Sequence, residues 1–185
     1  IIIGSADYAH VESLLDKQYR SYSNEYWKKK VLSPSSLIFY LGVKRKINKL
    51  IHHNLFFNED IEKHTNDIYL HKKWPDKPLF YVCCPSKTDP TVAPANKENI
   101  FILIPIASGL NDNLELREKY FNYTINKLEE YCNQDIKKDI EFKRSYCIHD
   151  FEKDYNALKG NAFGLANTLM QTANLKPKII NKKVN

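Results

Sequence analysis

Apolar residues in this chain come in short runs of strand type, separated by polar segments and by stretches of helical periodicity. The clearest runs are 79–84, which lies between Pro78 and Pro85, and 100–104. A continuous run of this kind is typical of a strand covered on both faces. We therefore expect two central, covered strands, the second ended or bulged by Pro105 because a proline nitrogen cannot donate to a ladder.

Weaker patterns predict further strands and a set of helices. β-branched and aromatic residues favour strands at 36–42, 53–57 and 140–147, with a basic turn at 44–49. A helix from Asn113 to Cys132 is indicated by apolar residues at helical spacing, namely Phe121, Ile125, Leu128 and Cys132. Shorter helices are expected at 5–15, within 19–30, at 59–69 capped by Asn58, at 150–158 and at 165–172, the last after a turn at 160–164.

These elements predict an α+β fold with a mixed, largely antiparallel sheet and flanking helices. We find no internal repeat and no linker rich in Gly, Ser or Pro that would divide the chain. Ile1 to Gly4 has the pattern of a strand end, and the single methionine is Met170 rather than residue 1. We interpret the chain as a fragment or processed piece, whose first strand belongs to a sheet encoded mostly upstream.

Lysine and arginine exceed the acids by 28 to 22 among 185 residues, a net charge of +6. The lysines are spread along the chain and lack the clustered aromatic and arginine pattern of a nucleic-acid platform, so we expect a solubilising surface and no nucleic-acid partner. A basic, non-catalytic module that binds membrane or nucleic acid stays open as an alternative, and it would focus these charges on one face.

The four cysteines form no C-x-x-C pair, and Cys83 and Cys84 are adjacent on a predicted strand. Such neighbours point to opposite faces, which indicates reduced thiols in a cytoplasmic protein. No apolar run approaches the ~18 residues of a membrane span.

Polar catalytic motifs are missing from the sequence. It has no G-x-G-x-x-G or Walker A run and no serine in a nucleophile elbow, so the catalytic residues stay unknown. His52 with His53, and His64 with His71, do not place two imidazoles on one helical face as an i, i+4 spacing would. From these spacings we expect no metal site.

Several segments together resemble the central region of bacterial-type phytoene desaturases. They follow the order and approximate spacing of that family over almost the whole chain: 34–42, His53-Asn54, Pro85-Ser86-Lys87-Thr88-Asp89-Pro90 with Ala93-Pro94, 99–105, Arg117, Gly160-Asn161-Ala162-Phe163-Gly164, Gln171 and Lys176-Pro177. The PS-x-TDP-x-x-AP run together with the later GNAFG is the most specific part of the resemblance.

The resemblance implies an FAD-dependent carotenoid desaturase of the flavin amine-oxidase-like superfamily. In that family a Rossmann-type FAD-binding fold is split, and an inserted middle part builds a sheet and helices over the substrate. The resemblance places the whole chain, 1–185, in this substrate-binding insert, with 1–7 as the returning strand of the FAD-binding domain. Both nucleotide-binding ends would lie outside the chain, so we expect none of its residues to bind the cofactor.

The expected reaction is hydride removal from phytoene to the flavin, which introduces conjugated double bonds during carotenoid biosynthesis. Related polyene enzymes remain alternatives: a diapophytoene desaturase, a carotenoid isomerase or a carotenoid oxidase. A hydrocarbon substrate needs apolar walls, so the expected substrate-binding residues are Phe39, Tyr81, Phe101, Phe163 and Gly164. A substrate drawn from lipid also implies a cytoplasmic enzyme, peripheral on the cytoplasmic membrane.

Overall fold

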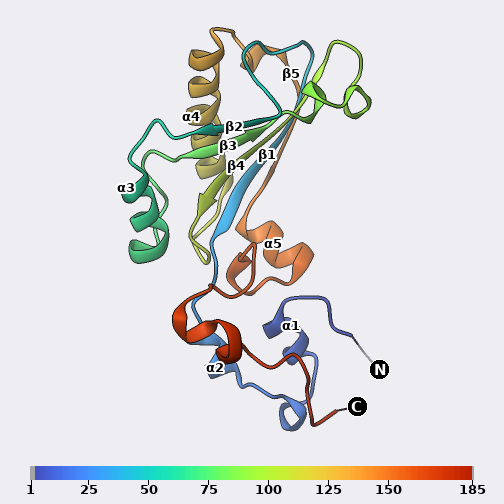
Figure 1. Ribbon diagram of the computed structural model, residues 1–185, viewed down its shortest axis with the longest axis vertical. Coiled ribbons are helices and arrows are strands. Elements are labelled where there is room, and N and C mark those ends of the chain that lie inside the picture. The colour runs from blue at the N-terminus through green and yellow to red at the C-terminus, as the bar shows by residue number, and fades with distance from the viewer. Residues whose placement is uncertain (1–2, 185) are drawn as a thin grey trace.

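The computed structural model describes residues 3–184, and its centre is a five-stranded sheet (Figure 1). The strand order is β2-β3-β4-β1-β5, and every neighbouring pair is antiparallel. The strands are β1 Ser35–Val43, β2 His53–Phe56, β3 Phe80–Cys83, β4 Glu98–Ile106 and β5 Ile140–Tyr146. The α+β class is therefore confirmed, with a sheet that is antiparallel throughout its described strands rather than mixed.

One face of the sheet is covered by the long helix α4, Leu114–Cys132, as Figure 1 shows. The predicted apolar stripe of α4 is fully buried, and Phe121 packs edge-on against Phe39 with ring centroids 5.4 Å apart. Asn113 caps the helix by accepting a hydrogen bond from the Leu116 N–H at 2.8 Å, as its sequence position predicts. The core thus lies between α4 and the inward residues of all the central strands.

The opposite face of the sheet is left open over most of its area, and α5, Ile148–Tyr155, contacts it only at one end, where Phe151 packs on Tyr146 of β5. Along β4 buried and partly exposed residues alternate, so that Ile102 is fully buried while Phe101 and Leu103 keep part of their surface. The expectation that the strands at 79–84 and 100–104 are covered on both faces is therefore wrong for this chain. The runs are continuous because the residues on the open face are apolar as well.

The remaining helices are short. They are α1 Tyr8–Ser13, α2 Asn24–Lys28, α3 Ile61–Asn66 and α5 Ile148–Tyr155. α3 begins two residues later than expected, because the Asp60 carboxylate rather than Asn58 accepts the first free N–H groups. No described helix is both long and apolar enough to cross a bilayer.

Two further expectations need correction. Pro105 neither ends nor bulges its strand, since β4 continues to Ile106 in regular register with β1. β3 begins at Phe80, so no residue of β3 lies opposite Pro105 to accept a hydrogen bond from its nitrogen. Residues 165–172 form no α-helix but only a 3-10 turn at Leu169–Gln171.

Below the sheet, the N-terminal and C-terminal segments lie side by side (Figure 1). Leu32 and Leu165 form an isolated bridge, and the buried Gln171 side chain bonds both backbone groups of Val31 at 2.8–2.9 Å. Residues 3–7 form no strand, and the expected strand residues Ile1 and Ile2 lie outside the described part of the chain.

Candidate functional site

The open face of the sheet carries a surface of mostly aromatic and aliphatic side chains. Its members are the residues that alternate with the core residues on each strand. We call this set the open face: Ile38 and Tyr40 of β1, His53 and Leu55 of β2, Tyr81 and Cys83 of β3, Phe101 and Leu103 of β4, and Phe142, Arg144 and Tyr146 of β5. Among these residues His53 and Arg144 are the basic ones, and none is Asp or Glu.

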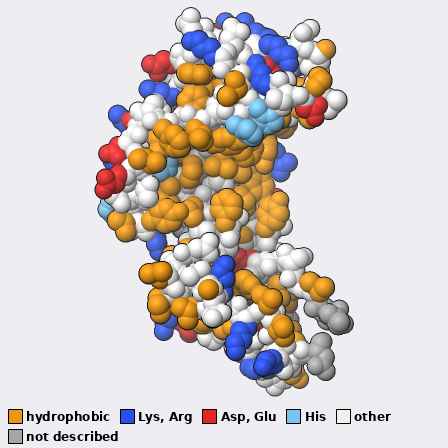
Figure 2. Space-filling view, viewed as in Figure 1, with side chains coloured by type: hydrophobic (Ala, Val, Ile, Leu, Met, Phe, Trp, Pro, Cys, Tyr) orange, Lys and Arg blue, Asp and Glu red, His pale blue; other side chains and the backbone are white. Residues whose placement is uncertain are grey.

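A row of rings crosses this face from β1 to β2. The ring centroids of Tyr40 and Phe101 are 5.5 Å apart, those of Phe101 and Tyr81 are 6.3 Å apart, and those of Tyr81 and His53 are 6.0 Å apart. Figure 2 shows hydrophobic side chains gathered over the sheet beside the histidines. Burial and the neighbouring Cys83 raise the pKa of Tyr81 to about 12, which keeps its hydroxyl neutral. The rings from Tyr40 through Phe101 to Tyr81 therefore offer flat, uncharged surface.

At the β1–β5 side the open face leads into a cleft of about 350 Å³. Its walls include Ile38 and Tyr40 of β1, Tyr146 of β5, Phe151 and Tyr155 of α5, and the backbone at Gly164. Tyr146 packs edge-on against Phe151 at 4.9 Å. Burial, followed by its hydrogen bond to Asp154, raises the pKa of Tyr146, so this ring is neutral too. The cleft therefore extends the aromatic row toward the end of the molecule that holds both termini.

The loop 160–164 is fixed against the N-terminal segment at the rim of the cleft. The Asn161 amide donates to the Asp7 carboxylate at 3.0 Å, and its oxygen accepts from the Gly164 N–H at 2.5 Å. Gly160 has φ +58°, and a Cβ there would lie 2.6 Å from Ile148. Only glycine fits this position, so the loop has a defined path along the cleft.

The structure brings together three of the five expected substrate-binding residues. Tyr81 and Phe101 lie in contact on the open face, and Gly164 lines the adjoining cleft. Phe163 is 75% exposed beside the cleft, so it is not a core residue. Phe39, by contrast, has no exposed surface and packs on α4, so its side chain lies on the other side of the sheet from the open face.

Sequence reasoning missed the aromatic residues that complete the row and the cleft. These are Tyr40, Tyr146, Phe151 and Tyr155. Strand parity carried a usable signal for Tyr40, because adjacent strand residues face opposite sides and Phe39 is in the core. Phe151 and Tyr155 are spaced i, i+4, which places them on one face of α5.

The described residues do not form a cradle for the pyrophosphate of a dinucleotide such as FAD. Such a cradle needs a glycine-rich turn and free N–H groups at a helix N-terminus. The first N–H groups of α1 and α3 are already bonded by the carboxylates of Asp7 and Asp60, and the Asp150 carboxylate occupies the start of α5. An acidic helix start repels a phosphate, so we derive no flavin-dependent step from these residues.

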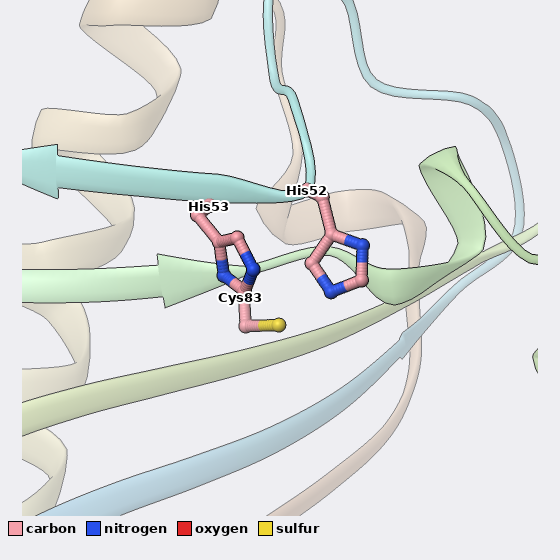
Figure 3. A group of neighbouring side chains, drawn as sticks. All are labelled: His52, His53 and Cys83. Atoms are coloured by element: carbon pink, nitrogen blue, oxygen red, sulfur yellow. The ribbon is translucent and has the colours of Figure 1, made fainter.

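A second cluster lies at the β2–β3 edge of the open face, where His52, His53 and Cys83 come within 4.8 Å of one another (Figure 3). Histidine spacing along a helix gives no sign of this cluster, because the third side chain comes from the neighbouring strand. His53 lies opposite Cys83 because β2 pairs with β3, and this pairing is visible only in the structure.

The chain is similar over nearly its whole length to curated carotenoid enzymes. It is 40% identical over 95% of its length to a carotenoid 3,4-desaturase of Haloarcula japonica, and covers 36% of that protein. It is 29% identical over 98% of its length to a 4,4'-diapophytoene desaturase of Staphylococcus haemolyticus, covering 38% of it. A zeta-carotene-forming phytoene desaturase of Myxococcus xanthus is 30% identical over 77% of the chain, which covers 28% of it.

The chain thus spans between 28% and 38% of the length of these relatives. No family model matches it. The resemblance to carotenoid desaturases that the sequence motifs indicated is confirmed, because relatives with three different desaturase names align with most or nearly all of the chain. The chain is therefore similar, over most or nearly all of its length, to a segment of these carotenoid desaturases.

Proposed function

We propose that this chain forms the substrate-binding part of a carotenoid desaturase, and that a hydrocarbon polyene lies along the open face. The observation that carries the proposal is the row of rings from Tyr40 through Phe101 to Tyr81, which continues into an aromatic cleft. A polyene has no hydrogen-bonding group, so it is recognised by apolar area and shape. Flat, neutral rings supply both at a low cost in side-chain entropy.

In this proposal the whole protein is an FAD-dependent oxidoreductase, and the chain is the insert of its split Rossmann-type FAD-binding fold. The flavin supplies the redox chemistry and is held by segments outside this chain. The residues of this chain bind the polyene, orient it and exclude water from it. The similarity to carotenoid desaturases and the spread of the lysines weigh against the alternative of a basic nucleic-acid-binding module.

Phytoene is our first choice of substrate. Among the relatives, one is named for phytoene, one for diapophytoene and one for 3,4-desaturation of a carotenoid. These polyenes differ in length and in the bond that is oxidised. Apolar packing on the open face does not by itself distinguish between them.

The test is conversion by the full-length protein. We expect the purified protein, supplied with FAD and detergent-dispersed substrate, to convert phytoene faster than diapophytoene or a 3,4-desaturase substrate, with products identified by chromatography and absorption. Faster conversion of either competitor would support the proposed desaturase activity but show that phytoene is not the preferred substrate. If no polyene is converted by a folded, flavin-loaded preparation, the proposed function is wrong.

We further propose that the protein binds the cytoplasmic membrane as a peripheral protein. Near the C-terminus exposed apolar side chains alternate with lysines: Leu169, Met170, Leu175, Ile179 and Ile180 are 52–87% exposed, and Lys176, Lys178, Lys182 and Lys183 lie among them. Apolar side chains that enter the interface, together with lysines that contact anionic head groups, are the composition of an interfacial anchor.

The expected result is that the protein floats with anionic liposomes and less with neutral ones, and that high salt weakens the anionic case. Ile179→Asp with Ile180→Asp should abolish most of this flotation. Leu114→Asp, a change at a 75% exposed leucine at the start of α4, should leave it intact. Equal flotation with neutral and anionic vesicles at all salt concentrations would exclude the lysines from the interaction.

A further inference from the structure

The three side chains of the second cluster offer one ligand atom each at metal-binding separation. Two are imidazoles and the third is a thiol, and their candidate ligand atoms lie within 4.8 Å of one another. His52 and Cys83 are half-buried and His53 is exposed, so an ion could enter from solvent. Figure 3 shows a ring nitrogen of each histidine on the side of the Cys83 sulfur.

Local backbone structure explains why two adjacent histidines face the same side. On a regular strand His52 and His53 would point to opposite faces. His52 instead lies in a bend just before β2, and its carbonyl accepts a hydrogen bond from the Cys84 N–H at 2.8 Å, which fixes the bend to β3. His53 is directly opposite Cys83 in the β2–β3 register. The cluster is therefore a product of the sheet and not of a mobile loop.

Hydrogen bonds also fix both rings in a binding orientation. His53 Nδ1 lies 2.6 Å from the Tyr81 hydroxyl, and His52 Nδ1 lies 2.5 Å from Thr88 Oγ1. With each Nδ1 occupied, Nε2 is the atom left to bind an ion. Histidines that ligate metals usually have their other ring nitrogen hydrogen-bonded in this way, because the bond sets the tautomer and the ring orientation.

We propose that His52, His53 and Cys83 bind a divalent metal ion of the zinc type, with water in the fourth position. Imidazole and thiolate suit Zn²⁺ and its tetrahedral chemistry, whereas Mg²⁺ and Ca²⁺ require oxygen ligands. Cys83 binds as the thiolate, and its proton passes to solvent. The ion would tie β2 to β3 at the edge of the open face, and its binding does not depend on the proposed substrate.

Titration of the protein with Zn²⁺ tests the proposal directly. We expect one ion per chain by calorimetry, and a rise in Tm of roughly 5–10 °C when Zn²⁺ exceeds Kd a hundredfold. Co²⁺ in place of Zn²⁺ should give the near-ultraviolet thiolate charge-transfer band and the intense visible bands of a four-coordinate site. Loss of an outer hydrogen-bonding partner alone costs roughly 10–100-fold in affinity, so loss of a ligand should cost more.

Variants separate this site from adventitious binding. Cys83→Ser should abolish the charge-transfer band, and His53→Ala should lower Zn²⁺ affinity by more than about 100-fold. If His53→Ala fails to fold, as judged by circular dichroism, His52→Gln takes its place. The matched controls are His71→Ala, an exposed histidine on another element, and Cys132→Ala, a buried thiol of α4, and both should bind as the unmodified protein does.

Two results would overturn the proposal. One is the absence of stoichiometric Zn²⁺ binding by the folded protein. The other is binding that Cys83→Ser leaves unchanged in affinity and in the cobalt spectrum, because the ion would then be held without the thiolate.

Discussion

Replacing Phe101 by Asp should, under the proposed function, lower carotenoid conversion by the full-length protein about 100-fold or more, while the protein stays folded. Phe101 lies at the centre of the open face, between Tyr40 and Tyr81. A carboxylate at this position keeps its hydration until a polyene covers it, and then loses it without gaining a partner. That loss costs several kcal/mol, and each 1.4 kcal/mol lowers the rate about tenfold.

A conservative variant and a distant control sharpen this prediction. Phe101→Leu keeps the apolar surface and loses only the flat ring, so we expect conversion to decrease by less than about tenfold. Leu114→Asp adds the same charge to an exposed apolar position on α4 and should leave conversion unchanged. The measurements are kcat/KM from product chromatography and Tm from circular dichroism on one preparation. Normal conversion by a folded Phe101→Asp protein would mean that the polyene does not lie on this face.

Much of the fold could be predicted because local patterns and tertiary packing agree. The stripe of Phe121, Ile125 and Leu128 indicates the buried side of α4, and Asn113 marks its start. The strand positions follow from β-branched and aromatic content. The strand order does not, since β1 pairs with β4 and β5 across more than fifty residues of intervening chain, and no local pattern encodes that choice.

The open face was the main failure of the sequence reasoning, and it has a physical cause. A strand buried on both sides and a strand with an apolar, functional outer side have the same composition, so Phe101 and Ile102 could not be told apart. Parity resolves the difference once one residue is placed. Because Phe39 is fully buried, Tyr40 and Ile38 must face the other side, and the candidate site shifts by one residue along β1.

Several motif residues that carry the family resemblance stabilise the loops around this sheet. Ser86 donates to the buried Glu98 carboxylate at 2.5 Å, and Lys87 forms an ion pair with it at 2.6 Å. Burial alone would raise the pKa of Glu98, but Lys87 and Ser86 outweigh it and hold the pKa below its usual value. Asn161 ties the late loop to Asp7 in a similar way. These residues preserve the shape of the site without contacting a ligand on the open face.

Arg117 joins three elements behind the cleft. Its guanidinium binds the fully buried Asp112 carboxylate through two hydrogen bonds of 2.8 and 2.5 Å, and it lies 2.8 Å from the Asp150 carboxylate at the start of α5. It also donates to Ser145 of β5 at 3.2 Å. Burial tends to raise the pKa of Asp112, but the hydrogen bonds and charge of Arg117 outweigh it, so the pKa lies below its usual value. α5, which carries Phe151, depends on this network for its position.

Arg117→Ala should therefore lower the free energy of unfolding at pH 7 by about 3–5 kcal/mol, because it leaves the buried Asp112 charge with the His149 N–H but without its cation. With its pKa lowered, Asp112 contributes stability above the ordinary carboxyl pKa of about 3.9, and that contribution is lost as the pH falls through the lower folded value. In the variant, burial outweighs the remaining hydrogen bond and the pKa of Asp112 rises. Protonation at low pH then removes the cost of the buried charge. The difference in unfolding free energy between the two proteins, measured by urea unfolding, should thus shrink between pH 7 and pH 4.

Lys28→Ala, which removes an exposed ion pair with Glu25, should barely change stability at either pH. A difference for Arg117→Ala that is equally large at both pH values would show that lost packing, and not the buried charge, is responsible.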